Sequence, residues 1–122
     1  MKHQTLFSPT KIKHLEIRNR FVRSATHVGT SFKNGYPYSN IEKIYEDLAK
    51  GGIGLIITGQ AIVRDCISDM NVDILPYSCI DDDCYIVPWT NIINKVHNEG
   101  SKIAMQISHL GIQGKLDLLK PE

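Results

Sequence analysis

Three short apolar runs alternate with two amphipathic stretches, and this alternation constrains the fold more than any other feature of the sequence. The runs lie at 21–25, 53–57 and 103–107, and each is nearly continuous in apolar residues. Such runs are typical of parallel strands that are covered on both faces of a sheet. We therefore expect a parallel α/β fold.

The first amphipathic stretch begins with a capping-box pattern, in which Ser39 precedes Glu42 by three positions. Gly51 and Gly52 end it. Its apolar residues recur at helical spacing: Ile41, Ile44, Tyr45 and Leu48. The pattern predicts a helix over 39–50.

The second stretch has Pro88 in a position typical of a first helical turn, and Gly100 ends it. Its apolar stripe consists of Trp89, Ile92, Ile93 and Val96. The resulting order is strand, helix, strand, helix, strand. Right-handed crossovers and a parallel sheet follow, so that a doubly wound sheet or a (β/α)₈ barrel is the natural parent fold.

Two regions flank or interrupt this pattern. Leu6-Phe7 and Leu15–Ile17 lie on either side of Pro9 and predict a short hairpin. The stretch from Val63 to Val87 predicts a long acidic loop with room for a short element.

Composition narrows the choice of partners. The chain has 122 residues, which predicts a single domain, and its 14 basic residues balance 13 acidic ones. This balance gives no electrostatic reason to expect nucleic acid or an anionic membrane as a partner. The sequence has no signal-peptide pattern and no apolar run near the roughly 18 residues of a membrane span, so that we expect a cytoplasmic location.

The remaining motifs favour structural roles. Gly51–Gly54 stands before a strand rather than after one, which indicates a helix end and a turn instead of a dinucleotide loop. Asp81–Asp83 predicts a solvated loop before a helix. Neither the three cysteines (Cys66, Cys79 and Cys84) nor the histidines show metal-ligand spacing, so that we expect no metal site and reduced thiols.

Polar residues follow each predicted strand, where ligands bind in parallel α/β folds. The three groups are Ser24–His27, Thr58–Ala61, and Gln106 with Ser108-His109. From the residues alone, a ligand site and ordinary strand-to-loop transitions both remain open.

At these positions the chain resembles the Old Yellow Enzyme family of FMN-dependent NAD(P)H oxidoreductases. The matching blocks are Leu6–Pro9, Asn19–Thr26, Gly51–Gly59 and Gly100–His109. The resemblance implies a TIM barrel with an N-terminal hairpin at its bottom and FMN at the carboxyl ends of its strands. Residues 1–18 would form the hairpin and 19–122 the first three βα units of a truncated (β/α)₈ barrel, together one partial domain.

The resemblance also assigns expected roles in binding FMN. The backbone of Ser24, Ala25 and Thr26 would lie along the flavin ring, and His27 would stand near its C4 carbonyl. The backbone of Gly59 and Gln60 would pass close to the ring. Gln106 would hydrogen-bond the pyrimidine edge of the flavin. NAD(P)H would be the electron donor, and a small activated alkene or related electrophile the substrate.

The sequence departs from the family in two ways. His109-Leu110-Gly111 is followed by Ile112, where the family often has arginine. The substrate-anchoring pair, the tyrosine proton donor and the phosphate-binding loops would all fall after Glu122, so that no catalytic residue can be assigned.

Three hypotheses follow. The first is a fragment of an FMN oxidoreductase that is inactive alone. The second is a non-catalytic α/β module that forms a homo-oligomer or complements a second half-barrel. The third is a small doubly wound domain of the flavodoxin kind, with a phosphate loop at Thr30–Gly35.

Overall fold

The computed structural model of the chain describes residues 4–29, 34–37, 39–63 and 77–109. The described elements are α1 (Gln4–Phe7), β1 (Thr10–Ile12), β2 (Leu15–Ile17), β3 (Val22–Arg23), α2 (Ser39–Lys50), β4 (Leu55–Ile62), β5 (Ser78–Cys79), a 3₁₀ helix (Asp83–Tyr85), α4 (Ile86–Asn98) and β6 (Lys102–Ser108). None of the helices in these ranges is long and apolar enough to cross a membrane.

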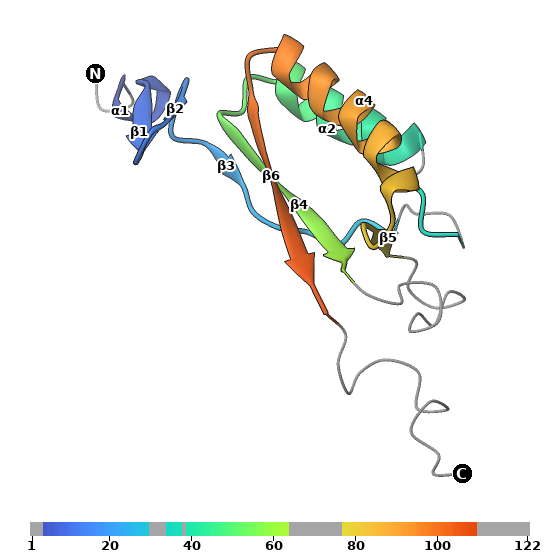
Figure 1. The fold of residues 1–122 in the computed structure, drawn as a ribbon. Coiled ribbons are helices and arrows are strands. Elements are labelled where there is room, and N and C mark those ends of the chain that lie inside the picture. The colour runs from blue at the N-terminus through green and yellow to red at the C-terminus, as the bar shows by residue number, and fades with distance from the viewer. Residues whose placement is uncertain (1–3, 30–33, 38, 64–76, 110–122) are drawn as a thin grey trace, which may run out of the picture.

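The main sheet is parallel, as the sequence predicts. β4 lies between β3 and β6, and Val22, Leu55 and Lys102 stand in register across the three strands. β5 also pairs with β4, but nearer the carboxyl end of β4 than β3 does, with Ser78 opposite Ala61. Helices α2 and α4 lie side by side along one face of the sheet (Figure 1). The β1–β2 hairpin lies at the end of the molecule opposite the carboxyl ends of β4 and β6 (Figure 1).

The core lies between the helices and the sheet. Tyr45 of α2, Val96 of α4 and Ile56 of β4 are at most 1% exposed. The other buried apolar residues of the two helices are Ile41, Ala49, Trp89 and Ile92. Most residues of the predicted stripes therefore lie in the core, because each helix places residues three and four positions apart on one face. Ile44, Leu48 and Ile93 are only half-buried, and Ala49 was not predicted.

One predicted element differs from the structure, and the loop predicted at 63–87 contains short elements as expected. Leu6 and Phe7 belong to the short helix α1 and not to a hairpin strand, because the Ser8 hydroxyl donates a 2.8 Å hydrogen bond to the Thr5 carbonyl and closes a helical turn. The hairpin consists of β1 and β2 instead. Within 63–87, the structure places β5, the 3₁₀ helix and the start of α4, while 64–76 lies outside the described residues.

The prediction of reduced thiols is wrong for Cys79, which is disulfide-bonded. Cys84 is an exposed free thiol, and Cys66 lies outside the described residues. The count and spacing of cysteines cannot show which of them meet in space, because a disulfide depends on the distance and direction of two side chains in the fold.

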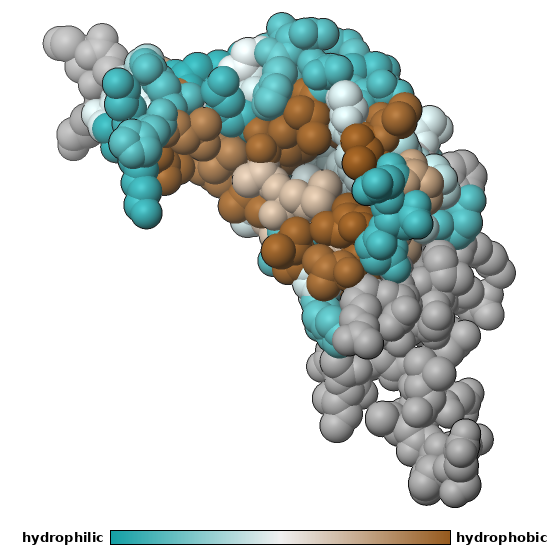
Figure 2. Space-filling view, in the orientation of Figure 1, coloured by the Kyte–Doolittle hydropathy of each residue, from teal (hydrophilic) through white to brown (hydrophobic). Residues whose placement is uncertain are grey.

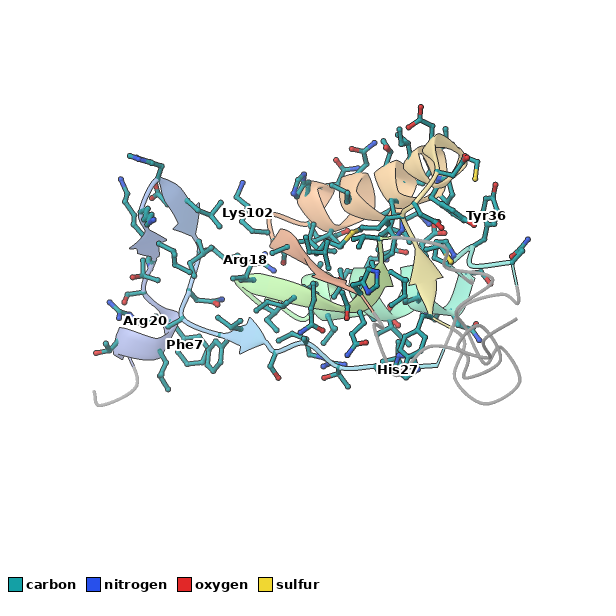
Figure 3. The ribbon with its side chains drawn as sticks, turned by 60° about the horizontal axis from the view of Figure 1, so that its bottom comes forward. Phe7, Arg18, Arg20, His27, Tyr36 and Lys102 are labelled. Atoms are coloured by element: carbon teal, nitrogen blue, oxygen red, sulfur yellow. The ribbon has the colours of Figure 1, made fainter. Side chains whose placement is uncertain are left out.

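Arg18 joins the elements at the amino-terminal ends of the strands (Figure 3). Its guanidinium donates to the carbonyls of Ala49 at 2.6 Å, Ile53 at 3.1 Å and Glu99 at 2.7 Å, and to the Ser101 hydroxyl at 2.8 Å. Ala49 and Glu99 lie at the carboxyl ends of α2 and α4, where unpaired carbonyls and the helix dipole favour a positive charge. One side chain thus caps both helices.

Replacing Arg18 by methionine should lower the free energy of unfolding by about 3 kcal/mol, because three carbonyls in partly buried hydrogen bonds lose a charged donor. Arg20→Met is the matched control, since Arg20 is exposed and should change stability by only about 0.5 kcal/mol. Urea unfolding followed by the fluorescence of the single tryptophan, the buried Trp89, measures both. Equal effects of the two variants would contradict this role of Arg18.

Candidate functional site

Gly59, within β4, meets the backbone of the segment that follows β3. Residues 58–61 and Gln106 were expected to follow their strands, but they lie inside β4 and β6, because both strands continue beyond the apolar runs. A Cβ added to Gly59 would lie 2.8 Å from the Thr26 carbonyl oxygen and 3.5 Å from the His27 Cα. Any side chain at Gly59 would therefore push the segment after β3 away from the sheet. The two predicted groups, Ser24–His27 and Gly59-Gln60, are in contact, and this contact depends on glycine.

The segment after β3 is held by a small network of its own. Arg23 Nη1 donates to the Ser24 carbonyl at 3.0 Å and to the Thr26 hydroxyl, which in turn donates to the Ser24 carbonyl at 3.2 Å. The His27 ring contacts the Tyr77 ring at a centroid distance of 4.8 Å. Ser24, Thr26 and His27 are exposed and Ala25 is half-buried, so that this segment is accessible at the end of the sheet.

Gln106 reaches the same edge from β6. It stands opposite Gln60 in the register of β4 and β6, and it is exposed. Its backbone N–H donates to the Thr58 hydroxyl at 3.1 Å. A side-chain amide carries both donors and an acceptor, as recognition of a heterocycle edge requires.

The buried part of the site contains Tyr45 from α2. Its hydroxyl accepts a 3.2 Å hydrogen bond from the Gly59 N–H. Burial raises the pKa of the Tyr45 phenol above its ordinary value, while the Gly59 N–H and the Arg23 charge oppose this increase. The phenol is therefore neutral at physiological pH and serves as a fixed hydrogen-bonding group.

The acidic run before α4 has a structural role. Asp81, Asp82 and Asp83 are exposed, and the Asp82 carboxylate accepts a 2.8 Å hydrogen bond from the Cys84 N–H at the start of the 3₁₀ helix. This hydrogen bond lowers the pKa of Asp82. In the ranges that the structure describes, no group of three histidine, cysteine or acidic side chains could hold a metal ion.

The structure thus brings the predicted site residues to one edge of the sheet: Ser24, Ala25, Thr26, His27, Gly59, Gln60 and Gln106. Figure 3 shows His27 at this edge, at the end of the sheet away from Arg18. Two further residues, Thr58 and Tyr45, hold this edge through hydrogen bonds. Thr58 belonged to a predicted strand-end group but had no assigned role toward the flavin, and Tyr45 was not predicted. The sequence does contain one indication of the role of Tyr45, because a tyrosine in an apolar helix stripe needs a hydrogen-bond partner for its hydroxyl. The phosphate loop considered at 30–35 lies largely outside the described residues.

The hairpin, the parallel strands and the covering helices define the opening segment of a TIM barrel, with its ligand edge at the carboxyl ends of the strands. The model of the NADH:flavin oxidoreductase / NADH oxidase family matches residues 5–122. The chain belongs to this family, whose cofactor is FMN and whose electron donor is NAD(P)H.

Individual relatives agree with this assignment. The N,N-dimethylglycine/sarcosine dehydrogenase of Chromohalobacter salexigens is 34% identical over 96% of the chain, which spans 17% of that protein. The NADH oxidase of Thermoanaerobacter brockii is 35% identical over 88% of the chain, which spans 16% of it. The old yellow enzyme structure from Trypanosoma cruzi matches 99% of the chain with a TM-score of 0.82 and 27% identity, and the chain spans 32% of it.

The residues at the strand ends fit one side of a flavin. Gly59 leaves the backbone of β4 without a side chain where it meets the segment after β3, and a flat ring can approach such a backbone closely. Gln106 offers an exposed amide beside it. The donor set is therefore neutral and suits a heterocycle rather than a metal ion.

Gly59→Ala should lower the free energy of unfolding by about 2 kcal/mol, because the new methyl group overlaps the Thr26 carbonyl. Amide chemical shifts should change along 24–27. Gly51→Ala is the control, since its added Cβ would lie 3.3 Å from the Leu48 carbonyl and Gly51 is exposed. If Gly59→Ala left the shifts of 24–27 unchanged, the close backbone contact would be refuted.

Proposed function

We propose that the chain forms the opening part of an FMN-dependent NAD(P)H oxidoreductase of the Old Yellow Enzyme type, and that the ends of β3, β4 and β6 form one side of its flavin site. The observation that supports this most directly is the contact of Gly59 with the Thr26 backbone beside the exposed amide of Gln106. A redox cofactor supplies its own chemistry, and the protein positions and tunes it.

Each residue has one role in the proposal. The backbone of Ser24, Ala25 and Thr26 would lie along the ring, and His27 would donate a hydrogen bond to the flavin C4 carbonyl. Gly59 and Gln60 approach the ring through their backbone. Gln106 pairs with the pyrimidine edge. Bound at this site, FMN would supply hydride transfer from NAD(P)H to an activated alkene or a similar electrophile.

The chain alone should not turn over NAD(P)H in this proposal. It spans 17% and 32% of two relatives, so that the other strand ends of the barrel contribute their contacts from outside it. The grip on the FMN phosphate and the proton donor belong to those strand ends by resemblance. Steady oxidation of NADPH by the purified chain with added FMN would contradict this part of the proposal.

Flavin binding tests the site directly. Titration of FMN with the purified chain should give saturable changes in flavin fluorescence. Gln106→Leu should weaken FMN binding about tenfold, because an edge of the flavin loses its partner. Asn94→Leu removes an exposed amide from α4 and should leave the affinity unchanged. Equal affinities for the wild-type chain and Gln106→Leu would contradict the assigned role.

A second candidate is a non-catalytic module that self-associates or complements another half-barrel. An open groove of about 790 Å³ supports it, between α1, the start of β3 and α2. Its apolar lining is Phe7, Phe21, Ile44, Leu48 and Ile53. Phe7 is 65% exposed and packs edge-on against Phe21 at 5.1 Å. Figure 2 shows hydrophobic surface from beside the hairpin down to the ends of β4 and β6.

Light scattering separates the second candidate from the first. Self-association through the groove should weaken in Phe7→Ser, because a large exposed apolar side chain is lost. Leu15→Ser is the control, since Leu15 is 40% exposed on β2 and does not line the groove. A chain that stays monomeric at high concentration would remove the reason for a self-associating module.

A further inference from the structure

The pairing of β4 with β6 contains a bulge directly below the proposed flavin edge. Ile57 stands opposite Ala104, and the next pair in register is Gln60 with Gln106. Two residues of β4, Thr58 and Gly59, therefore occupy the space that one residue of β6 spans. A bulge interrupts the ladder of backbone hydrogen bonds and redirects the residues that follow it.

The Thr58 side chain replaces the interrupted backbone hydrogen bonds. Its hydroxyl accepts the 3.1 Å hydrogen bond from the Gln106 N–H and donates a 2.8 Å hydrogen bond to the Gly59 carbonyl. Thr58 is 1% exposed, so that water cannot take over these bonds without a change of structure. The hydroxyl thus links the bulge to β6 at the residue that carries the flavin-facing amide.

Tyr45 supports the other half of the bulge. Its hydroxyl accepts the 3.2 Å hydrogen bond from the Gly59 N–H, and its side chain is 1% exposed within the core. The position of this hydroxyl is therefore fixed by the packing of α2 on the sheet. The polar groups of Gly59 are both paired with side chains, and Gly59 can lie against the Thr26 carbonyl.

The geometry points to Thr58 and Tyr45 as positioning residues that hold the β4 bulge and thereby align Gly59 and Gln106 for the flavin. Neither side chain touches the flavin in this account. The role of this alignment in binding flavin rests on the proposed function. The alignment itself depends only on hydrogen bonds within the chain. The two can therefore be tested separately.

The test compares Thr58→Val, which keeps the shape and removes the hydroxyl, with Thr58→Ser, which keeps the hydroxyl. Amide hydrogen exchange of the isotope-labelled chain is the first readout. Loss of one hydrogen bond should speed exchange at Gln106 about fivefold in Thr58→Val, and Thr58→Ser should restore slow exchange. Tyr45→Phe should do the same at the Gly59 amide. Ile92→Val is the control, because it lowers stability from the core of α4 without touching the bulge.

FMN affinity, measured by flavin fluorescence, is the second readout. Thr58→Val and Tyr45→Phe should weaken binding more than Ile92→Val does, and Thr58→Ser should bind as the wild-type chain does. Faster exchange spread evenly over all amides, as in Ile92→Val, would show a role in stability only and overturn the inference. If Thr58→Val does not fold, Tyr45→Phe and Thr58→Ser decide the question by the same comparison. If the wild-type chain binds no FMN, the proposed function fails, while the exchange data still decide the alignment.

Discussion

The guanidinium of Arg18 is the interaction on which the other elements depend. Arg18 lies in the chain between the hairpin and β3. Its guanidinium donates to carbonyls at the ends of α2 and α4 and to the residues that precede β4 and β6. Its hydrogen-bond acceptors are all uncharged, so that the ends of the helix dipoles balance its charge. The neighbouring Asn19 adds a 2.6 Å hydrogen bond from its amide to the Gly52 carbonyl. The starts of the strands are therefore fixed in position relative to one another.

This arrangement separates stability from binding along the strands. The amino-terminal ends carry the polar network of Arg18, and the carboxyl ends carry exposed polar residues such as Thr26 and Gln106. Residues at the carboxyl face of a barrel sheet vary with chemistry, whereas residues at the other face maintain the fold. The bulge at Thr58 and Gly59 lies between these two ends of the strands. It sets the position of the binding edge relative to the fixed amino-terminal ends.

The sequence predicts the repeating elements and not the contacts that arrange them. The helices over 39–50 and after Pro88 follow from a local periodicity, and the parallel strands follow from continuous apolar runs. The short elements α1 and β5 have too few residues for any periodicity. Nothing in the sequence distinguishes Arg18 from Arg20 or Arg23. Only the fold shows that Arg18 contacts the ends of both helices. The site residues were predicted from their position at strand ends and from resemblance, and their roles toward FMN remain proposals.

The most direct test of the account is a titration of the isotope-labelled chain with FMN, followed residue by residue through its backbone amide signals. The largest changes should fall on 24–27, on Gly59 and Gln60, and on Gln106. The amides around Arg18 should not change, because they lie at the other end of the strands (Figure 3). Changes centred on 30–35 would instead support a phosphate loop of the flavodoxin kind. Changes at that loop alone, or none at the three strand ends, would contradict the flavin edge.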